Sequence, residues 1–265
     1  MKRHTKQSNK QKLGQYFTTN TEMLLRNYTH YFKGKDVVDP FAGDCDLLNF
    51  ATKNGARSTE AYDINPRHPN TSFRDSLVNP PDFNGKFLLT NPPYLSSNKN
   101  KIKTVYKIWD MNDYYKCHIA SFCSPPSLQE GILILPSNFL SESSSKARDT
   151  FFRFYSIKQC DYYYYPVFDD ATTGICVFYF ERDQFGVSKN IPIRIHYSET
   201  NIVDHVMEIH EKNGWLDGDE FFEFIDVAEP PFSKWTGKEP GVLTNIVVGL
   251  LDKGAYKQGL TYNDG

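Results

Sequence analysis

The sequence predicts an α/β protein built on a doubly wound, mostly parallel β-sheet. Short apolar runs alternate with segments of helical character through the first two thirds of the chain, an order typical of parallel sheets covered by helices. Several of these runs end in a polar residue, which would place polar side chains at the carboxyl edge of the sheet. The length of 265 residues suits one sizeable domain and a small appendage.

Local signals assign the individual elements in chain order. A helix is expected from about Thr21 to Tyr31, because Thr19 or Asn20 can cap it and Glu22 favours its first turn. The remaining expected elements are a strand ending at Asp39, a helix to about Lys53, strands over 58–62, 71–73, 87–90 and 131–135, helices over 114–122 and 143–155, and strands over 157–165, 174–180 and 191–197.

The last third of the chain has a different character. The strands over 157–165 and 174–180 are close enough to form an antiparallel hairpin at the edge of the sheet. Between Glu199 and Glu239 there are eleven acidic residues and three lysines, a poor composition for binding a polyanion, and His205 and His210 are expected on a surface helix. We therefore divide the chain into a basic arm (1–12), a main α/β domain (13–183) and a C-terminal region (184–265).

Composition excludes several classes of protein. The net charge is −2, so any nucleic acid would have to be bound by local patches rather than by bulk charge. The basic start of the chain is not followed by an apolar core, and no apolar run is long enough to span a bilayer, so neither a secretory signal nor a membrane is expected. Aromatic residues make up 15% of the chain, enough to supply both a core and rings for stacking.

Cysteine usage indicates a cytoplasmic protein. The chain has five cysteines, an odd number, without a Cys-x-x-Cys pair, and all lie in or near apolar runs. Buried, reduced thiols are the expected result. Cys117, His118 and Cys123 make only half of a metal site, so no metal is predicted.

Four polar residues occupy successive strand ends in this arrangement. Asp39, Asp63 and Asp75 each follow a predicted strand, and Asn91 follows the strand over 87–90. The carboxyl ends of parallel strands meet at one edge, where open α/β sheets bind their ligands. The sequence therefore predicts a ligand site formed by these four side chains.

The segment Asn91-Pro92-Pro93-Tyr94 is the most specific feature of the chain. Each proline fixes its own backbone and holds the preceding residue extended, which makes a stiff corner at the end of the strand. The Asn91 side-chain oxygen and the Pro92 backbone oxygen can then accept both hydrogens of an NH2 group, while the Tyr94 ring stacks on its ring system. A rigid turn with a buried tyrosine is the alternative interpretation of this segment.

A lysine-rich loop follows this corner directly. Lys99, Lys101, Lys103 and Lys107 lie within the twelve residues from Ser96 to Lys107. Such a loop is usually only solvated, but beside a pocket of the size of a nucleobase it is a candidate for phosphate contacts.

The order of three motifs resembles the gamma-type N6-adenine DNA methyltransferases of restriction–modification systems. The motifs are Gly14-Gln15-Tyr16-Phe17-Thr18, Asp39-Pro40-Phe41-Ala42-Gly43 and Asn91-Pro92-Pro93-Tyr94, and the resemblance covers roughly residues 11–182. It implies a Rossmann-like methyltransferase sheet over 13–183, S-adenosyl-L-methionine as the cofactor and double-stranded DNA as the substrate. It also implies a cognate restriction endonuclease in the same system as a partner, with 184–265 as part of a target-recognition region.

The resemblance also assigns roles to individual residues. Tyr16, Phe17 and Thr18 would lie beside the methionine end of the cofactor, and Asp39, Phe41 and Gly43 would form the cofactor loop. Asp63 would bind the ribose, Ile64 would contact the adenine ring, and Asp75 would accept from the adenine amino group.

The target adenine has to leave the duplex to reach this site. The resemblance implies that it stacks between Tyr94 and Phe168, with Asn91 and Pro92 as its catalytic partners and Lys99, Lys101 and Lys103 near the DNA. A phenylalanine simply buried in the hairpin is the alternative for Phe168.

One residue departs from the family pattern. Cys45 stands where the cofactor loop usually has a second glycine, which suggests a less tight turn or a displaced loop. Three other functions stay open: methylation of RNA adenine, methylation of a protein glutamine amide, and a non-catalytic specificity subunit on the same fold.

Overall fold

A computed structural model describes most of the first 217 residues. The described residues are 20–123, 127–142, 145–165, 167–168, 174–183, 186 and 188–217. The chain divides into two compact units, Met1–Glu223 and Phe224–Gly265, and every described residue belongs to the first. The predicted basic arm and the segment with Tyr16, Phe17 and Thr18 lie outside the described residues. Within the described part, none of the helices has the length and apolar character needed to cross a membrane.

Helices and strands alternate as predicted through the first half of the chain. The helices are α2 (Thr21–Leu25), α3 (Asp46–Lys53), α4 (Thr104–Trp109), α5 (Tyr114–Cys123), α6 (Asn138–Ser141) and α7 (Lys146–Phe152), with 3-10 turns η1 (Thr29–Tyr31), η2 (Ser97–Lys99) and η3 (Glu211–Asn213). The strands are β1 (Asp36–Asp39), β2 (Ser58–Asp63), β3 (Thr71–Phe73), β4 (Phe87–Thr90), β5 (Glu130–Pro136), β6 (Tyr155–Tyr163), β7 (Ile175–Arg182), β8 (Ser188–His196), β9 (Ile202–His210) and β10 (Leu216–Asp217).

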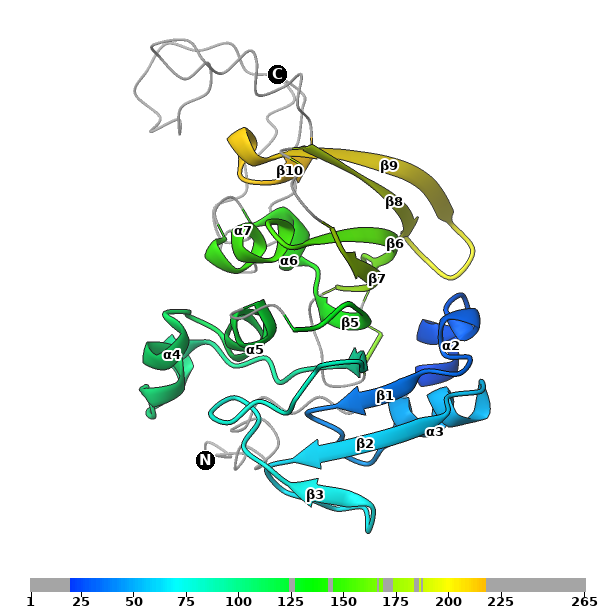
Figure 1. Cartoon of the computed structure of the whole chain (residues 1–265). Coiled ribbons are helices and arrows are strands. Elements are labelled where there is room, and N and C mark those ends of the chain that lie inside the picture. Colours follow the sequence, from blue (N-terminus) through cyan, green and yellow to red (C-terminus); the bar gives the residue numbers. More distant parts are fainter. Residues whose placement is uncertain are drawn as a thin grey trace, which may run out of the picture. The chain divides into compact units, whose positions relative to one another are not determined.

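The described strands form one sheet in the order β10-β9-β8-β6-β7-β5-β4-β1-β2-β3 (Figure 1). Five of the nine pairings between these strands are parallel, and the block β3-β2-β1-β4-β5 is parallel throughout. This order confirms the doubly wound α/β class with an antiparallel edge. It also places the carboxyl ends of β1, β2, β3 and β4 along one edge of the sheet, because parallel neighbours end on the same side.

The antiparallel pair predicted at the sheet edge lies inside the sheet. β6 pairs antiparallel with β7, as predicted for these segments. β8 then adds to the other side of β6 in parallel orientation, so the edge hairpin is β8–β9, with β10 outside it. The alternation of Ile191, Ile193 and Ile195 predicts a strand here, but it cannot indicate which neighbour that strand will choose. The sheet thus continues past residue 183, the predicted end of the main domain.

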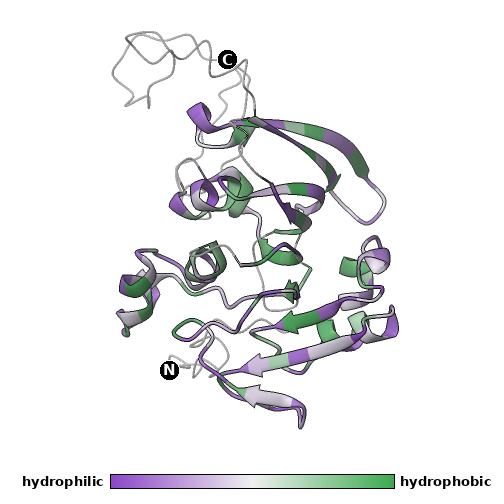
Figure 2. Cartoon of the chain, viewed as in Figure 1, coloured by the Kyte–Doolittle hydropathy of each residue, from purple (hydrophilic) through white to green (hydrophobic). Residues whose placement is uncertain are grey.

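Each face of the sheet has its own hydrophobic core. Leu88, Leu133 and Phe178 point to the face packed by α5, α6 and α7. Leu89 and Ile132, next to them in sequence, point to the opposite face, where α2 and α3 pack. Figure 1 shows these two sets of helices on opposite sides of the strands, and Figure 2 shows the apolar residues concentrated in the central strands rather than in β2 and β3. Burial on both faces requires the continuous apolar runs that predict β4 and β5.

Gly131 allows β5 to lie close to β4. A Cβ atom at this position would meet the Leu88 backbone oxygen at 2.6 Å and the Leu88 Cβ at 2.7 Å. Both atoms belong to the strand that leads into Asn91, so any larger residue at 131 would push the two strands apart.

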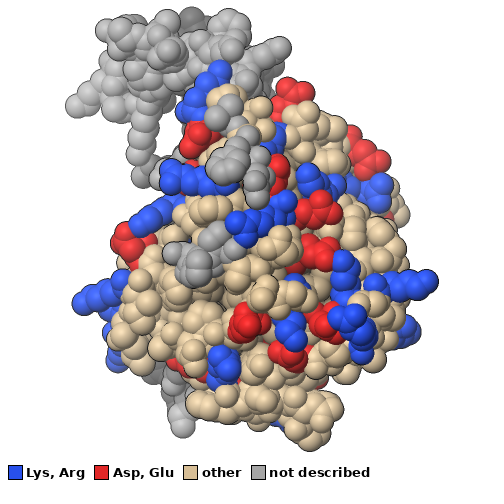
Figure 3. Space-filling view, in the orientation of Figure 1, with Lys and Arg blue, Asp and Glu red and all other residues tan. Residues whose placement is uncertain are grey.

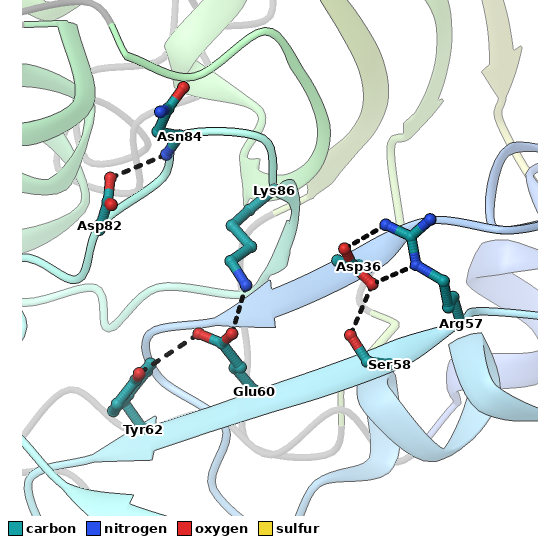
Figure 4. A network of polar contacts seen from close by, with 8 residues as sticks. All are labelled: Asp36, Arg57, Ser58, Glu60, Tyr62, Asp82, Asn84 and Lys86. Atoms are coloured by element: carbon teal, nitrogen blue, oxygen red, sulfur yellow. Dashed lines mark hydrogen bonds and ion pairs between the residues drawn. The ribbon is translucent and has the colours of Figure 1, made fainter.

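A network of ionic contacts links β1, β2 and the residue before β4 (Figure 4). Arg57 and Ser58 both bond to the carboxylate of Asp36, and Lys86 bonds to Glu60. The Arg57 contact lowers the pKa of the Asp36 carboxyl. The contact between Arg57 and Asp36 is exposed, so it adds little stability, whereas the contact between Lys86 and Glu60 is partly buried.

Two local predictions are wrong. The predicted helix from Thr21 to Tyr31 ends at Leu25 and resumes only as the turn η1. Its interruption is explained by Asn27, whose side chain donates to the Asp161 carboxylate (3.3 Å) and whose carbonyl accepts from Gln159 (3.3 Å). His205 and His210 lie on strand β9 rather than on a helix, because β9 completes the hairpin with β8.

All five cysteines are free and buried. Burial raises the pKa of the Cys117 thiol to about 12 and raises the pKa of the other four thiols as well. Protonated, buried thiols are poor nucleophiles and poor metal ligands.

Candidate active site at the carboxyl edge of the parallel strands

Asp39 lies at the end of β1 with its carboxylate 1% exposed. One carboxylate oxygen accepts the Phe41 backbone N–H (2.9 Å) and the Thr90 hydroxyl (2.6 Å). Burial, helped by the nearby charge of Asp63, raises the pKa of Asp39 to about 7 against the effect of these two hydrogen bonds. The Thr90 bond joins the ends of β1 and β4, so Asp39 and the start of the Asn91 corner form one unit.

Asp63, at the end of β2, supports the loop that follows β1. Its two carboxylate oxygens accept the backbone N–H groups of Gly43 (3.0 Å) and Asn65 (2.7 Å). A carboxylate has about four acceptor positions, so each oxygen keeps one for a further donor. The loop after β1 is thereby held against the end of β2, next to Asp39.

Cys45 adopts a backbone conformation that glycine favours. Its backbone angles are φ 65° and ψ 20°, in the left-handed region, and Gly43 two residues earlier is also at positive φ (51°). A non-glycine residue in this region is strained by about 1 kcal/mol. The Cys45 thiol contacts the Thr71 hydroxyl on β3 at 3.2 Å.

Ile64 and Asp75 extend the site along the edge. Ile64 follows Asp63 directly, and its side chain is 48% exposed. Asp75 is half-buried after β3. Phe41, in the loop after β1, packs edge-on against the buried His118 ring of α5 at 4.9 Å. Burial lowers the pKa of His118 to about 3, so this ring is neutral near pH 7.

The Asn91 corner is held by the hydroxyl of Tyr94. That hydroxyl lies against the Asn91 side-chain oxygen and, at 2.7 Å, against the Ile134 backbone oxygen on β5. Asn91 is 8% exposed, and the Tyr94 ring is half-buried with its edge toward the Tyr115 ring at 6.1 Å. The Tyr94 hydroxyl thus holds the Asn91 side chain at the end of β4, next to β5.

The lysine-rich loop is tied back to this corner. The Tyr106 hydroxyl donates to the Leu95 backbone oxygen (2.9 Å), directly after Tyr94. The Asn100 side-chain amide donates to the hydroxyls of Tyr106 (3.2 Å) and Tyr114 (2.6 Å). The predicted DNA-contacting residues Lys99, Lys101 and Lys103 are all exposed on this loop, and the Lys103 ammonium contacts the Ser97 carbonyl.

Phe168 lies apart from the exposed part of the site. Its ring is 4% exposed and belongs to the core on the side of α2 and α3. The Val167 carbonyl before it accepts the side-chain amide of Asn20 (2.7 Å). A base could stack on this ring only after the ring is uncovered.

Three contributors to the site could not be identified from sequence. Thr90, Asn100 and Tyr106 act through hydrogen bonds to Asp39, Tyr114 and Leu95. The only signal was position: Thr90 ends a predicted strand, and Asn100 interrupts a run of lysines.

A separate groove of about 780 Å³ lies in the other half of the sheet. It is lined by residues of β6, β8 and β9 together with Asn27, and it contains none of the predicted site residues. Within the described residues, no group of three His, Cys, Asp or Glu side chains is placed to hold a metal ion. On the face shown in Figure 3, acidic and basic side chains are interspersed rather than separated.

Comparison with solved structures identifies the fold. A modification subunit of a putative type I restriction enzyme from Vibrio vulnificus YJ016 aligns over 77% of this chain and 58% of its own, with a TM-score of 0.53 and 12% identity. A putative class I S-adenosylmethionine-dependent methyltransferase from Listeria monocytogenes aligns over 75% of this chain and 69% of its own, with the same TM-score and identity. The chain has a methyltransferase fold.

Other matches to the methyltransferase fold come from larger proteins. The type I restriction enzyme EcoKI M protein aligns over 69% of this chain but 48% of its own, with a TM-score of 0.50 and 13% identity. This chain therefore spans only about half to two thirds of the length of these relatives. No protein-family profile matches the sequence, and no curated protein is similar to it.

Proposed function

We propose that this protein is a site-specific DNA methyltransferase that moves a methyl group from S-adenosylmethionine to the N6 amino group of a flipped-out adenine. The observation that carries the proposal is the position of Asn91-Pro92-Pro93-Tyr94 at the carboxyl end of β4, bonded through Thr90 to Asp39, in a methyltransferase fold. This corner offers acceptors to a planar NH2 group at the edge where α/β sheets bind ligands.

The described residues fit S-adenosylmethionine. Ile64 presents an exposed apolar face between Asp63 and Asp75, which suits a flat adenine ring. Asp63, which accepts from Gly43 and Asn65, would take the ribose hydroxyls, and the half-buried Asp75 would accept from the adenine amino group. The positive φ of Gly43 and Cys45 lets the backbone of the loop approach a ligand closely.

The bound cofactor supplies a methyl group activated by a sulfonium. The residues of this chain act on the nitrogen that receives it. Asn91 and the Pro92 carbonyl accept the two N–H groups, which favours a pyramidal nitrogen and stabilises the positive charge that develops there. The methyl carbon would pass from sulfur to this nitrogen, which would then release one proton to solvent.

Tyr94 has two roles in this proposal. Its ring stacks on the target base, and its hydroxyl fixes the orientation of the Asn91 amide. Phe168 serves as the second stacking surface, which requires its buried ring to be uncovered as DNA binds. Lys99, Lys101 and Lys103 contact phosphates, and partners from the same restriction–modification system would complete target recognition.

The test is methyl transfer from radiolabelled S-adenosylmethionine to unmethylated duplex DNA, followed by digestion to nucleosides. We expect label in N6-methyladenine, and a rate for Asn91→Ala lower by about 100-fold or more, the effect of removing one transition-state hydrogen bond. Asn98→Ala, at an exposed position of the next loop, is the matched control and should retain the wild-type rate.

Parallel assays with RNA and with a protein carrying an accessible glutamine separate the alternatives. Label in RNA or protein but not in DNA would show that DNA is the wrong substrate, while the assigned active site would still stand. No transfer to any substrate, together with no calorimetric binding of S-adenosylmethionine, would favour a non-catalytic specificity subunit. An unchanged rate for Asn91→Ala would overturn the assigned role of the amide.

A further inference from the structure

Ile102 is the most exposed aliphatic side chain near the site. It is 68% exposed, and it lies between the exposed residues Lys101 and Lys103. Residues 96–109 contain four lysines and no acidic residue. Complete burial of an isoleucine is worth about 1.5 to 3 kcal/mol, so an apolar partner that covers Ile102 would gain up to this free energy.

The position of Ile102 is fixed relative to the Asn91 corner. The Ile102 backbone N–H donates to the Asn100 side-chain oxygen (3.0 Å), and the amide group of the same side chain donates to the Tyr106 and Tyr114 hydroxyls. The Tyr106 hydroxyl in turn bonds to the carbonyl of Leu95, the residue after Tyr94. Three side-chain hydrogen bonds in succession therefore connect Ile102 to the corner.

The aromatic support beneath the loop is rigid. The Tyr106 and Tyr114 rings stack with centroids 4.9 Å apart and an interplanar angle of 13°. Tyr114 begins α5, and Asp113 before it accepts the Leu95 backbone N–H (3.1 Å). The lysine-rich loop thus presents the apolar Ile102 side chain among positive charges. The Tyr106 side chain that supports this loop also bonds to Leu95, directly after the corner.

We propose that Ile102 is a wedge that enters the base stack of duplex DNA when the target adenine leaves it. This inference rests on the proposed function and adds a residue that acts on the DNA rather than on the adenine. The lysines on either side match the phosphates of the two strands, and the aliphatic side chain fills the gap left between the neighbouring bases. The wedge stabilises the extrahelical state of the base, so it matters only where a base has to be unstacked.

The test compares native and heat-denatured DNA of the same unmethylated source. For Ile102→Ser we expect the initial rate on native DNA to fall by about tenfold or more, and the rate on denatured DNA to fall by less than about twofold. Ile108→Ser is the matched control, because Ile108 is 49% exposed on the adjacent helix α4, and its rates should equal those of the wild type on both DNA forms.

A second measurement does not depend on turnover. Insertion of a wedge unwinds DNA, so plasmid relaxed by a topoisomerase with saturating wild-type protein should show a shifted distribution of linking number. The shift should persist with Ile108→Ser and be lost with Ile102→Ser, while the protein still binds the plasmid.

Three results would overturn the inference. The first is an equal loss of methylation rate of Ile102→Ser on native and denatured DNA, and the second is an unchanged rate of this variant on native DNA. The third is a linking-number shift that persists with Ile102→Ser. If the wild-type protein methylates neither form of DNA, the proposed function itself fails. If it methylates native DNA and Ile102→Ser does the same, only the wedge fails.

Discussion

The two halves of the sheet use buried charge in opposite ways. In the parallel half, Asp39 and Asp63 stand at strand ends and accept only backbone N–H and hydroxyl groups among the described residues. In the other half, Asp161 lies within β6 and faces His196 of β8 at 2.7 Å, with both side chains almost fully buried. A buried carboxylate that faces a histidine inside the sheet serves the fold, whereas the Asp39 carboxylate, uncompensated by any cation among the described residues, has a raised pKa and marks a candidate site.

The largest expected effect comes from breaking the buried pair of Asp161 and His196. Asp161→Ala leaves the His196 ring and the Asn27 amide without their shared acceptor, so we expect a loss of about 4 kcal/mol in the free energy of unfolding. Urea denaturation measures this loss. The methylation rate per folded molecule should be unchanged, because Asp161 is not part of the candidate site.

Arg194→Ala is the control for this prediction. It breaks the exposed ion pair with Asp204, where we expect a loss below about 1 kcal/mol. Equal losses of unfolding free energy for Asp161→Ala and Arg194→Ala would mean that the burial of the Asp161–His196 pair has no effect on stability.

The next effect tests the uncompensated carboxylate. Because the pKa of Asp39 is raised to about 7, the folded state holds its proton more tightly than the unfolded state does. The Asp39 contribution to stability is therefore present below about pH 4 and is lost as the pH rises to about 7, by about 3 kcal/mol. In Asp39→Asn the amide oxygen can still accept from Phe41 and Thr90, and this part of the pH dependence should disappear.

The measurement is the difference in unfolding free energy between wild type and Asp39→Asn from pH 4 to pH 8. Asp44→Asn, at an exposed position of the same loop, should follow the wild type. A constant difference between wild type and Asp39→Asn across this range would contradict the raised pKa.

The smallest effect concerns the strained turn. Both Cys45→Gly and Cys45→Ala lose the thiol contact with Thr71, but only alanine keeps a Cβ at φ 65°. We expect the glycine variant to be more stable by about 1 kcal/mol, the reverse of the usual order for these residues. Thermal unfolding compares them directly, and a more stable alanine variant would show that the turn is relaxed.

Sequence predicted the site half of the sheet better than the other half. The ends of β1, β2 and β4 follow from local patterns, because an apolar run closed by Asp39, Asp63 or Asn91 has only one plausible strand register. The neighbour of β8 depends on pairing with β6, more than thirty residues earlier in the chain, and nothing local encodes that choice.

The predictions that failed share a cause. Asn27 breaks a helix because Asp161, far away in sequence, offers its side chain a better partner. His205 and His210 lie on a strand rather than on a helix because β9 pairs with β8. In both places tertiary contacts outweigh local preference.

The burial of every native thiol makes the protein well suited to site-specific labelling. Maleimide dyes react with exposed thiolates, and none of the five cysteines offers one, so Ile102→Cys would carry the single reactive position. A fluorophore placed there would report directly, molecule by molecule, when the loop meets a double helix and how long it stays.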